Sequence, residues 1–83
     1  MKIYADVVFA DAGSIKVKLD GLIKQNKITR TKLARMVNVD YRRIRGLCSG
    51  ETSRIDFDLL TRICYTLECS VSDVIEYIPP KDE

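Results

Sequence analysis

Hydrophobic and polar residues alternate with a period of two at the beginning of the chain. In residues 1–11, every second residue from position 3 to position 9 is apolar, and these side chains would share one side of an extended backbone: Ile3, Ala5, Val7 and Phe9. Residues 14–18 alternate in the same way, and Gly13 between the two segments can take the positive φ of a tight turn. A period of two is typical of β-strands, so the pattern predicts a β-hairpin over residues 1–18.

A hairpin of two strands has little stability by itself in water, so this one is expected to pack against something. It either covers the core of its own domain or pairs through its open edge with a second copy of the chain. The alternating pattern does not decide between these two arrangements.

From residue 19 onward the apolar residues recur every three or four positions, as they do on one face of an α-helix. Capping side chains precede several of these segments, and Pro79-Pro80 ends the last one because proline cannot continue a helix. The helices are expected over residues 19–25, from Thr29, over residues 40–48, from Asp56 through Leu67, and from Ser70 to Ile78.

These elements predict a mainly α, five-helix fold preceded by the hairpin. The chain has 83 residues, a length that suits one domain with one core. We therefore expect a single domain over residues 1–83, with the hairpin over 1–18, a helical part over 19–78 and a short tail over 79–83.

The helix expected over residues 40–48 has two contrasting faces. One stripe is apolar and should face the core: Ile44, Leu47 and Cys48. The other face is aromatic and cationic: Tyr41, Arg42, Arg43 and Arg45. A solvated helix face normally mixes both charge signs, whereas this helix has no acidic residue after its cap, Asp40. The exposed face therefore indicates a binding surface.

The segment from Thr29 to Gly50 resembles the helix-turn-helix of the Cro/repressor-like, or XRE-type, family. The positions that carry the resemblance are Thr29, Leu33, Ala34, Val37, Val39, Ile44, Leu47 and Gly50. The small Ala34 suits a close crossing of two helices, whose shared core would be Leu33, Val37, Ile44 and Leu47. More loosely, the resemblance extends from about Ile15 to Ile78. It implies a five-helix, repressor-like domain that binds double-stranded DNA.

The resemblance also implies which residues contact DNA. Those expected to read bases in the major groove are Tyr41, Arg42, Arg45 and Gly46. Those expected to contact the DNA backbone are Arg30, Thr31, Arg43, Ser53 and Arg54. Arg42 should make a bidentate contact to guanine. Gly46 has no side chain, so either the protein backbone approaches the DNA there or fewer side chains carry the specificity.

Basic residues are concentrated in one part of the sequence. The net charge is +2, yet residues 14–54 hold eleven basic and three acidic residues, while the rest of the chain holds three basic and nine acidic ones. A polyanion would be attracted to the basic part. The same surface would also attract an acidic protein, so the alternative function is an antitoxin-like or anti-repressor interaction module.

The inventory of reactive residues argues against an enzyme. The sequence has no histidine, no glycine-rich phosphate loop and no nucleophile-elbow motif. Asp56, Asp58 and Asp73 are explained as helix caps and first-turn acids, which interact favourably with the helix dipole. We expect no catalytic activity and no cofactor.

Three cysteines, Cys48, Cys64 and Cys69, show no CxxC spacing, so a zinc site is not expected. They are interpreted as small, partly buried hydrophobic residues. The alternative is redox sensing by Cys48, since the neighbouring arginines would favour its thiolate form.

The longest apolar run, residues 7–10, is far shorter than the ~20 residues that cross a membrane. With one lysine and no signal-peptide core near the N-terminus, a cytoplasmic location is expected, with no membrane partner and no small-molecule ligand.

One module of this size covers only ~600–1,000 Å² of DNA surface. We therefore expect a homodimeric, repressor-like transcriptional regulator.

Overall fold

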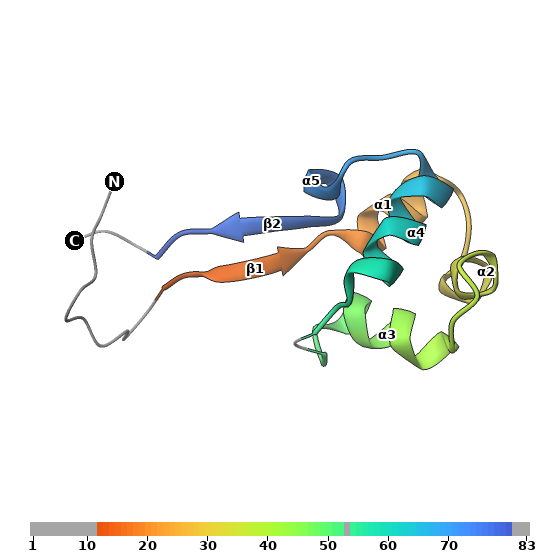
Figure 1. Ribbon diagram of the computed structural model, residues 1–83, viewed down its shortest axis with the longest axis horizontal. Helices are drawn as coiled ribbons and strands as arrows, with labels where there is room; N and C mark the ends of the chain where they lie inside the picture. Colours follow the sequence, from red (N-terminus) through yellow and green to blue (C-terminus); the bar gives the residue numbers. More distant parts are fainter. Residues whose placement is uncertain (1–11, 53, 81–83) are drawn as a thin grey trace.

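The computed structural model describes residues 12–52 and 54–80. These residues form five helices and two short strands. In chain order they are β1 (Ser14–Val17), α1 (Leu19–Gln25), α2 (Arg30–Met36), α3 (Tyr41–Ser49), α4 (Phe57–Leu67), α5 (Val71–Val74) and β2 (Ile75–Ile78). The helices form one body, and the two strands project from it as an arm (Figure 1). The predicted mainly α, five-helix fold is confirmed.

The helices begin where the sequence places capping residues. Thr29, Asp40 and Asp56 precede α2, α3 and α4, and each side chain accepts a hydrogen bond of 2.7–3.0 Å from an amide in the first turn. These bonds satisfy amides that have no partner within the helix. The helix predicted over residues 40–48 is therefore α3, with Asp40 as its cap.

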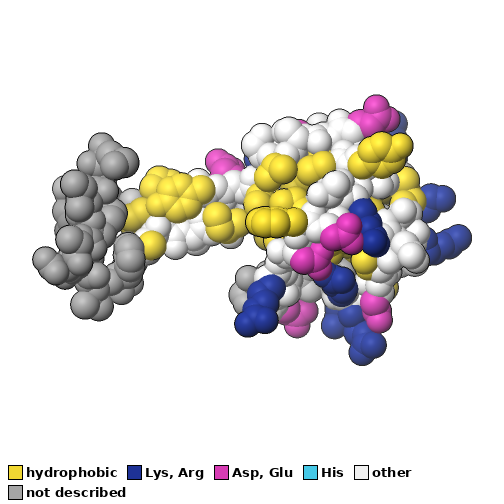
Figure 2. Space-filling view, viewed as in Figure 1, with side chains coloured by type: hydrophobic (Ala, Val, Ile, Leu, Met, Phe, Trp, Pro, Cys, Tyr) yellow, Lys and Arg dark blue, Asp and Glu magenta, His cyan; other side chains and the backbone are white. Residues whose placement is uncertain are grey.

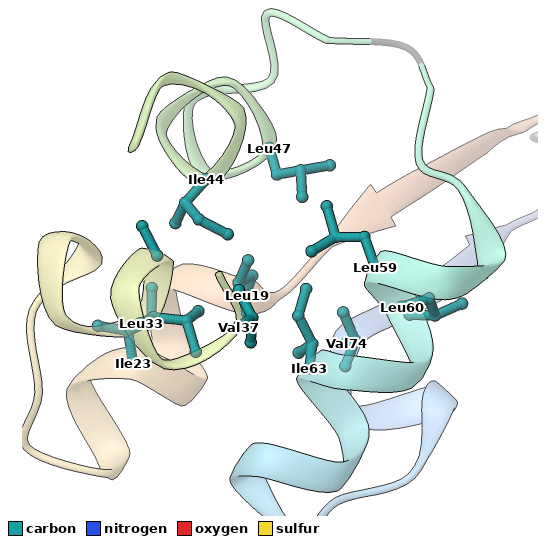
Figure 3. Packing of buried hydrophobic residues seen from close by; sticks show 11 residues of the cluster. Leu19, Ile23, Leu33, Val37, Ile44, Leu47, Leu59, Leu60, Ile63 and Val74 are labelled. Atoms are coloured by element: carbon teal, nitrogen blue, oxygen red, sulfur yellow. The ribbon is translucent and has the colours of Figure 1, made fainter. Parts of the chain in front are cut away.

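One hydrophobic core joins the five helices (Figure 3). The predicted shared core of the helix-turn-helix is confirmed, because Leu33, Val37, Ile44 and Leu47 are all buried, together with Ala34. The other core members are Leu19 and Ile23 of α1, Leu59, Leu60 and Ile63 of α4, and Val74 of α5. In Figure 3 the side chains of α3 point toward those of α2 and α4. Each fully buried aliphatic side chain favours folding by roughly 1.5–3 kcal/mol.

The turn between α2 and α3 is held by a residue in a left-handed conformation. Asn38 has a φ of 59°, and the amide of Val39 donates a hydrogen bond of 3.0 Å to the carbonyl of Ala34. This closing bond is typical of a helix C-terminus that reverses direction. It sets the angle at which α3 leaves α2, and thereby the face of α3 that reaches solvent.

The two strands form an antiparallel sheet, but they lie at opposite ends of the described chain. Ser14 lies opposite Ile78, and Val17 lies opposite Ile75. The predicted strand at residues 14–18 is thus present as β1. Its predicted partner, within residues 1–11, lies outside the described residues, and the partner observed among the described residues is β2.

The prediction that the last helix continues to Ile78 is wrong. α5 ends at Val74, and the chain continues as β2. A helix of four residues gains few internal hydrogen bonds, whereas Ile75 and Tyr77 are of types that favour strands. The carbonyl of Val74 accepts a hydrogen bond of 2.7 Å from the amide of Lys18, which starts the pairing.

Candidate nucleic-acid interface

The exposed face of α3 is the centre of the candidate site. Burial of Ile44 and Leu47 fixes the rotation of this helix, so its opposite side faces solvent. The four predicted side chains on that side are exposed: Tyr41, Arg42, Arg43 and Arg45. In Figure 2 basic side chains lie on the part of the body formed by α2 and α3.

Two arginines of α3 are available to a ligand. The side chain of Arg42 is 79% exposed, and its one ion-pair partner among the described residues is Asp40, with Nη2 3.5 Å from Oδ2. Arg45 makes no hydrogen bond or ion pair with any residue that the structure describes. The amide and the guanidinium of Arg42 together hold the pKa of the Asp40 carboxyl below its ordinary value. Asp40 therefore stays ionised as a helix cap at neutral pH.

Arg43 is held by an acidic residue. Its Nη2 lies 2.5 Å from Oδ2 of Asp56, the residue that caps α4. The pKa of Asp56 is lowered, first by the hydrogen bond from the amide of Leu59 and then by Arg43. This ion pair joins α3 to the start of α4, and it neutralises part of the charge that Arg43 would offer to a phosphate.

Arg30 is paired in the same way at the start of α2. Its Nε and Nη2 donate to the two carboxylate oxygens of Asp20, both at 3.2 Å. Arg30 lowers the pKa of Asp20, and Asp20 raises the pKa of Arg30. The pair links α1 to α2. The neighbouring Thr31 is exposed.

Sequence reasoning did not find these two pairings, although it did assign Asp56 as a helix cap. The partners are separated by 10 and 13 residues, so no i, i+4 spacing on one helix indicates them. Only the packing of α1 against α2, and of α3 against α4, brings the charges together.

A cleft of about 220 Å³ brings several predicted site residues together. Its lining residues are Arg42, Arg43, Leu47, Thr52, Arg54 and Leu59. It thus joins one predicted base-reading residue with two predicted backbone contacts. Arg54 is exposed, and Ser53, the other loop residue predicted to contact DNA, lies outside the described residues. Arg30 and Thr31 belong to α2 and do not line this cleft.

Gly46 faces the loop after α3. The amide of Thr52 donates a hydrogen bond of 3.3 Å to the carbonyl of Gly46, and a Cβ added at Gly46 would lie 3.6 Å from the Cβ of Thr52. A side chain at this position would therefore point toward Thr52. Base reading by Gly46 stays a prediction, and only its backbone is placed to take part.

Comparison with known protein families matches the part of the chain that contains the helices. Residues 18–80 match the Cro/C1-type HTH DNA-binding domain. The chain belongs to this family of DNA-binding domains. The chain is also similar to a solved structure, the transcriptional regulator VanUg in crystal form II, with 22% sequence identity and a TM-score of 0.70. That alignment covers 90% of this chain and 99% of VanUg, and it shows the shared fold. A comparison with curated proteins finds no match.

Cys48 lies beside the Asp20–Arg30 pair of this Cro/C1-type domain. Burial raises the pKa of the Cys48 thiol, and this effect is larger than the opposite effect of Arg30. Arg30 thus favours the thiolate, as expected of a neighbouring cation, but burial outweighs it and the net shift of the Cys48 pKa is upward. Cys48, Cys64 and Cys69 are free and half-buried, and all three pack at the edge of the core, in agreement with their interpretation as small hydrophobic residues.

The helices of the Cro/C1-type domain are short. Among the residues described, no helix has the length and apolar character needed to cross a membrane.

Proposed function

We propose that this protein is a sequence-specific transcriptional regulator, acting as a repressor in the cytoplasm, that reads the major groove of double-stranded DNA with α3. The observation that supports this most is the face of α3 that carries Tyr41, Arg42 and Arg45. It is exposed, it has no acidic side chain of its own, and the buried face of the same helix holds it rigidly. A major groove about 12 Å wide accommodates such a helix.

Within this proposal, Arg42 carries most of the base discrimination. A guanidinium donates two parallel hydrogen bonds to O6 and N7 of guanine, and the contact that Arg42 would give up first, to Asp40, is a long one of 3.5 Å. Tyr41 would contact a thymine methyl group or donate a hydrogen bond, and Arg45 would reach a neighbouring base. Gly46 would contribute through its backbone, because its Cβ direction is toward Thr52.

The flanking basic residues would hold the DNA backbone. Arg43 and Arg54 line the cleft beside α3, and Ser53 lies between them in the sequence. Arg30 and Thr31 would contact phosphates from the start of α2. Because Arg30 and Arg43 are already paired with aspartates, each would share its guanidinium between a carboxylate and a phosphate. Such contacts position a protein on DNA without selecting a sequence.

A homodimer is part of the proposal. Two copies would place their α3 helices in successive major grooves, about 34–36 Å apart, and would together bury the surface that one module lacks. Bound across a promoter, such a dimer represses by excluding other proteins. The description of VanUg as a transcriptional regulator supports a regulatory role for the shared fold.

The test is selection of bound duplexes from a random pool, with the purified full chain at moderate salt. We expect enrichment of an inverted repeat whose half-sites are one helical turn apart. Failure to enrich any sequence, with binding that only fades as salt rises, would contradict the proposal. That result would favour the interaction module, which uses the same basic face on an acidic protein.

A further inference from the structure

The arm formed by β1 and β2 has one apolar and one mixed face. Side chains alternate between the two faces of a strand, and residues directly opposite each other share a face. The register therefore puts two cross-strand pairs, Ile15 with Tyr77 and Val17 with Ile75, on the same face. The other face carries Ser14, Lys16, Glu76 and Ile78.

The apolar face is open where the arm projects farthest. Ile15 is 59% exposed and Tyr77 is 57% exposed, whereas Val17 and Ile75 pack partly against the core. The hydroxyl of Tyr77 donates a hydrogen bond of 2.8 Å to the carbonyl of Ala12, which anchors the ring at the end of the arm. Figure 2 shows hydrophobic side chains along the arm and on the body where the arm begins. A two-stranded sheet is stable only when such a face is covered.

The apolar face continues into a hollow of the helical body, which we call the arm groove. Its volume is about 770 Å³. It is lined by Ile15, Val17 and Ile75 of the arm, by Arg43 and Leu47 of α3, and by Thr52, Arg54, Ile55 and Asp56 of the following loop. The arm groove is therefore mainly apolar, and it begins at the base of the same face that is exposed at the tip.

We propose that the arm groove and the apolar face of the arm form the interface between two copies of this chain. A two-fold rotation would place Ile15 and Tyr77 of each copy against the arm groove of the other. The same patch is then used twice, as a closed dimer requires. This inference rests on the proposed function, because it names the surface that builds the DNA-binding homodimer.

The shape and size of the surface favour a second copy as the occupant. Projecting side chains and the hollow that would receive them lie on one continuous face, so the surface is complementary to itself. The arm alone is too small for a stable interface, which buries roughly 800 Å² on each partner. Adding the half-buried Ile55, at the wall of the arm groove, extends the contact onto the body.

The charges are compatible with this interface. Within the arm groove, Arg43 is already neutralised by Asp56. Arg54 also lines the groove, but it is exposed and lines the cleft beside α3 as well, so its guanidinium can stay on that side. On the mixed face of the arm, Oε1 of Glu76 lies 3.7 Å from Nζ of Lys18, and the Glu76 side chain is exposed to solvent. Tyr41, Arg42 and Arg45 do not line the arm groove. The dimer would therefore leave the proposed base-reading face open.

The test is sedimentation equilibrium of the full chain and three variants, with folding checked by circular dichroism. Ile15→Lys puts a charge on the apolar face at an exposed position, so it should fold. Ile78→Lys alters the mixed face of the same arm, and Tyr65→Lys alters a residue of α4 that is 85% exposed. We expect a wild-type dimer, a rise of at least about tenfold in the dimer dissociation constant for Ile15→Lys, and little change for the two controls.

Three results would overturn the proposal. One is dimerisation that Tyr65→Lys abolishes and Ile15→Lys leaves intact, which would place the interface on α4. Another is a monomeric wild type whose melting temperature falls with Ile15→Lys, which would assign the apolar face to the chain's own residues 1–11. The third is a monomeric wild type that Ile15→Lys does not affect.

Binding to a duplex with a single half-site, measured in parallel, separates this inference from the proposed function. A monomer that still binds the half-site selectively would remove only the dimer interface. A dimer that Ile15→Lys disrupts, but that selects no duplex, would leave the interface standing and remove the proposed function.

Discussion

At the scale of single residues, aspartates determine which arginines of this domain are available. Asp20 and Asp56 hold Arg30 and Arg43 in ion pairs, whereas the one ion-pair contact of Arg42 with a described residue is 3.5 Å long and made with its own helix cap. The loosely held Arg42 and the two closely paired arginines should therefore play different parts. Arg42 can turn fully toward a base, and the paired arginines present a partly neutralised charge to the DNA backbone.

Substitution of Arg42 by alanine should relax base selectivity at the position that Arg42 reads and leave the fold unchanged. The loss expected is about 1–3 kcal/mol of discrimination at one base pair of each half-site. Competition binding with duplexes that differ at single positions measures it. The comparison variant is Arg30→Ala, which should weaken binding to every duplex alike; because it also breaks the link between α1 and α2, its melting temperature is measured alongside. Uniform weakening by both variants would remove Arg42 from the base-reading role.

The aspartates also predict how stability depends on pH. The pKa values of Asp20, Asp40, Asp56 and Asp73 are all lowered in the folded chain by hydrogen bonds from arginines or from backbone and serine groups. The unfolded chain therefore binds more protons in acid, and the stabilisation is complete above the ordinary aspartate pKa of about 4. As the pH falls below about 4, through the lowered pKa values, this stabilisation is lost.

Thermal melting across pH checks this expectation. Since the sequence has no histidine, the melting temperature should stay nearly constant between about pH 5 and 8 and fall in stronger acid. The Asp56→Asn variant should be less stable than the wild type at neutral pH, and its melting temperature should fall less on acidification. A marked transition near pH 6, or an unchanged acid response in this variant, would contradict the assignment.

At the scale of elements, the sequence predicts best what local interactions decide. α1 lies where its apolar stripe places it, and α2 to α4 also begin at capping residues. Caps and stripes both act within a few residues of the chain. The β2 strand was missed for the opposite reason. Its pairing partner is β1, at the far end of the described chain, and the mostly apolar segment 74–78 suits a helix or a strand equally well until that partner is known.

In the candidate site, too, features set by local interactions could be predicted and those set by distant partners could not. The exposed position of Arg42 and Arg45 follows from the helical period of α3, and the structure agrees with it. The pairing of Arg43 with Asp56, and the contact of Gly46 with Thr52, depend on where the loop after α3 packs. No spacing in the sequence indicates that packing.

Gly46→Ala should stabilise α3. Glycine within a helix costs about 1 kcal/mol relative to alanine, and the added methyl group would meet Thr52 at an ordinary contact distance. Gly21→Ala in α1, where nothing lies within 4 Å of the added Cβ, is the matched control. Chemical denaturation should show a gain of up to about 1 kcal/mol for each variant.

Affinity for the selected duplex should hardly change in either variant, because the methyl group at position 46 would point toward the loop. A large loss of affinity in Gly46→Ala alone would show instead that the backbone of α3 approaches the DNA at this residue.

At the scale of the whole molecule, the basic face and the arm groove adjoin each other. Arg43 and Arg54 line both the cleft beside α3 and the arm groove. A second copy seated in the arm groove would therefore fix the distance between the two α3 helices. The arm groove would then determine both the spacing of the half-sites and the affinity between the subunits.

Salt dependence measures this arrangement directly. Each phosphate neutralised by the protein contributes about −0.9 to the slope of log affinity against log salt concentration. A dimer on an inverted repeat should show about twice the slope of one subunit on a single half-site. Fluorescence anisotropy across a salt series provides both slopes. Equal slopes on the two duplexes would mean that only one subunit contacts DNA.

The pairing of β1 with β2 has a consequence for synthesis. During translation β1 and all five helices are made before β2, so the partner of β1 is among the last described residues to be synthesised. A chain cut short before Ile75 would keep its DNA-reading helix but lose half of the arm. Under the dimer inference, such a fragment occupies half-sites singly and weakly. Complete translation would then be a condition for tight binding, and incomplete chains would compete poorly with intact protein.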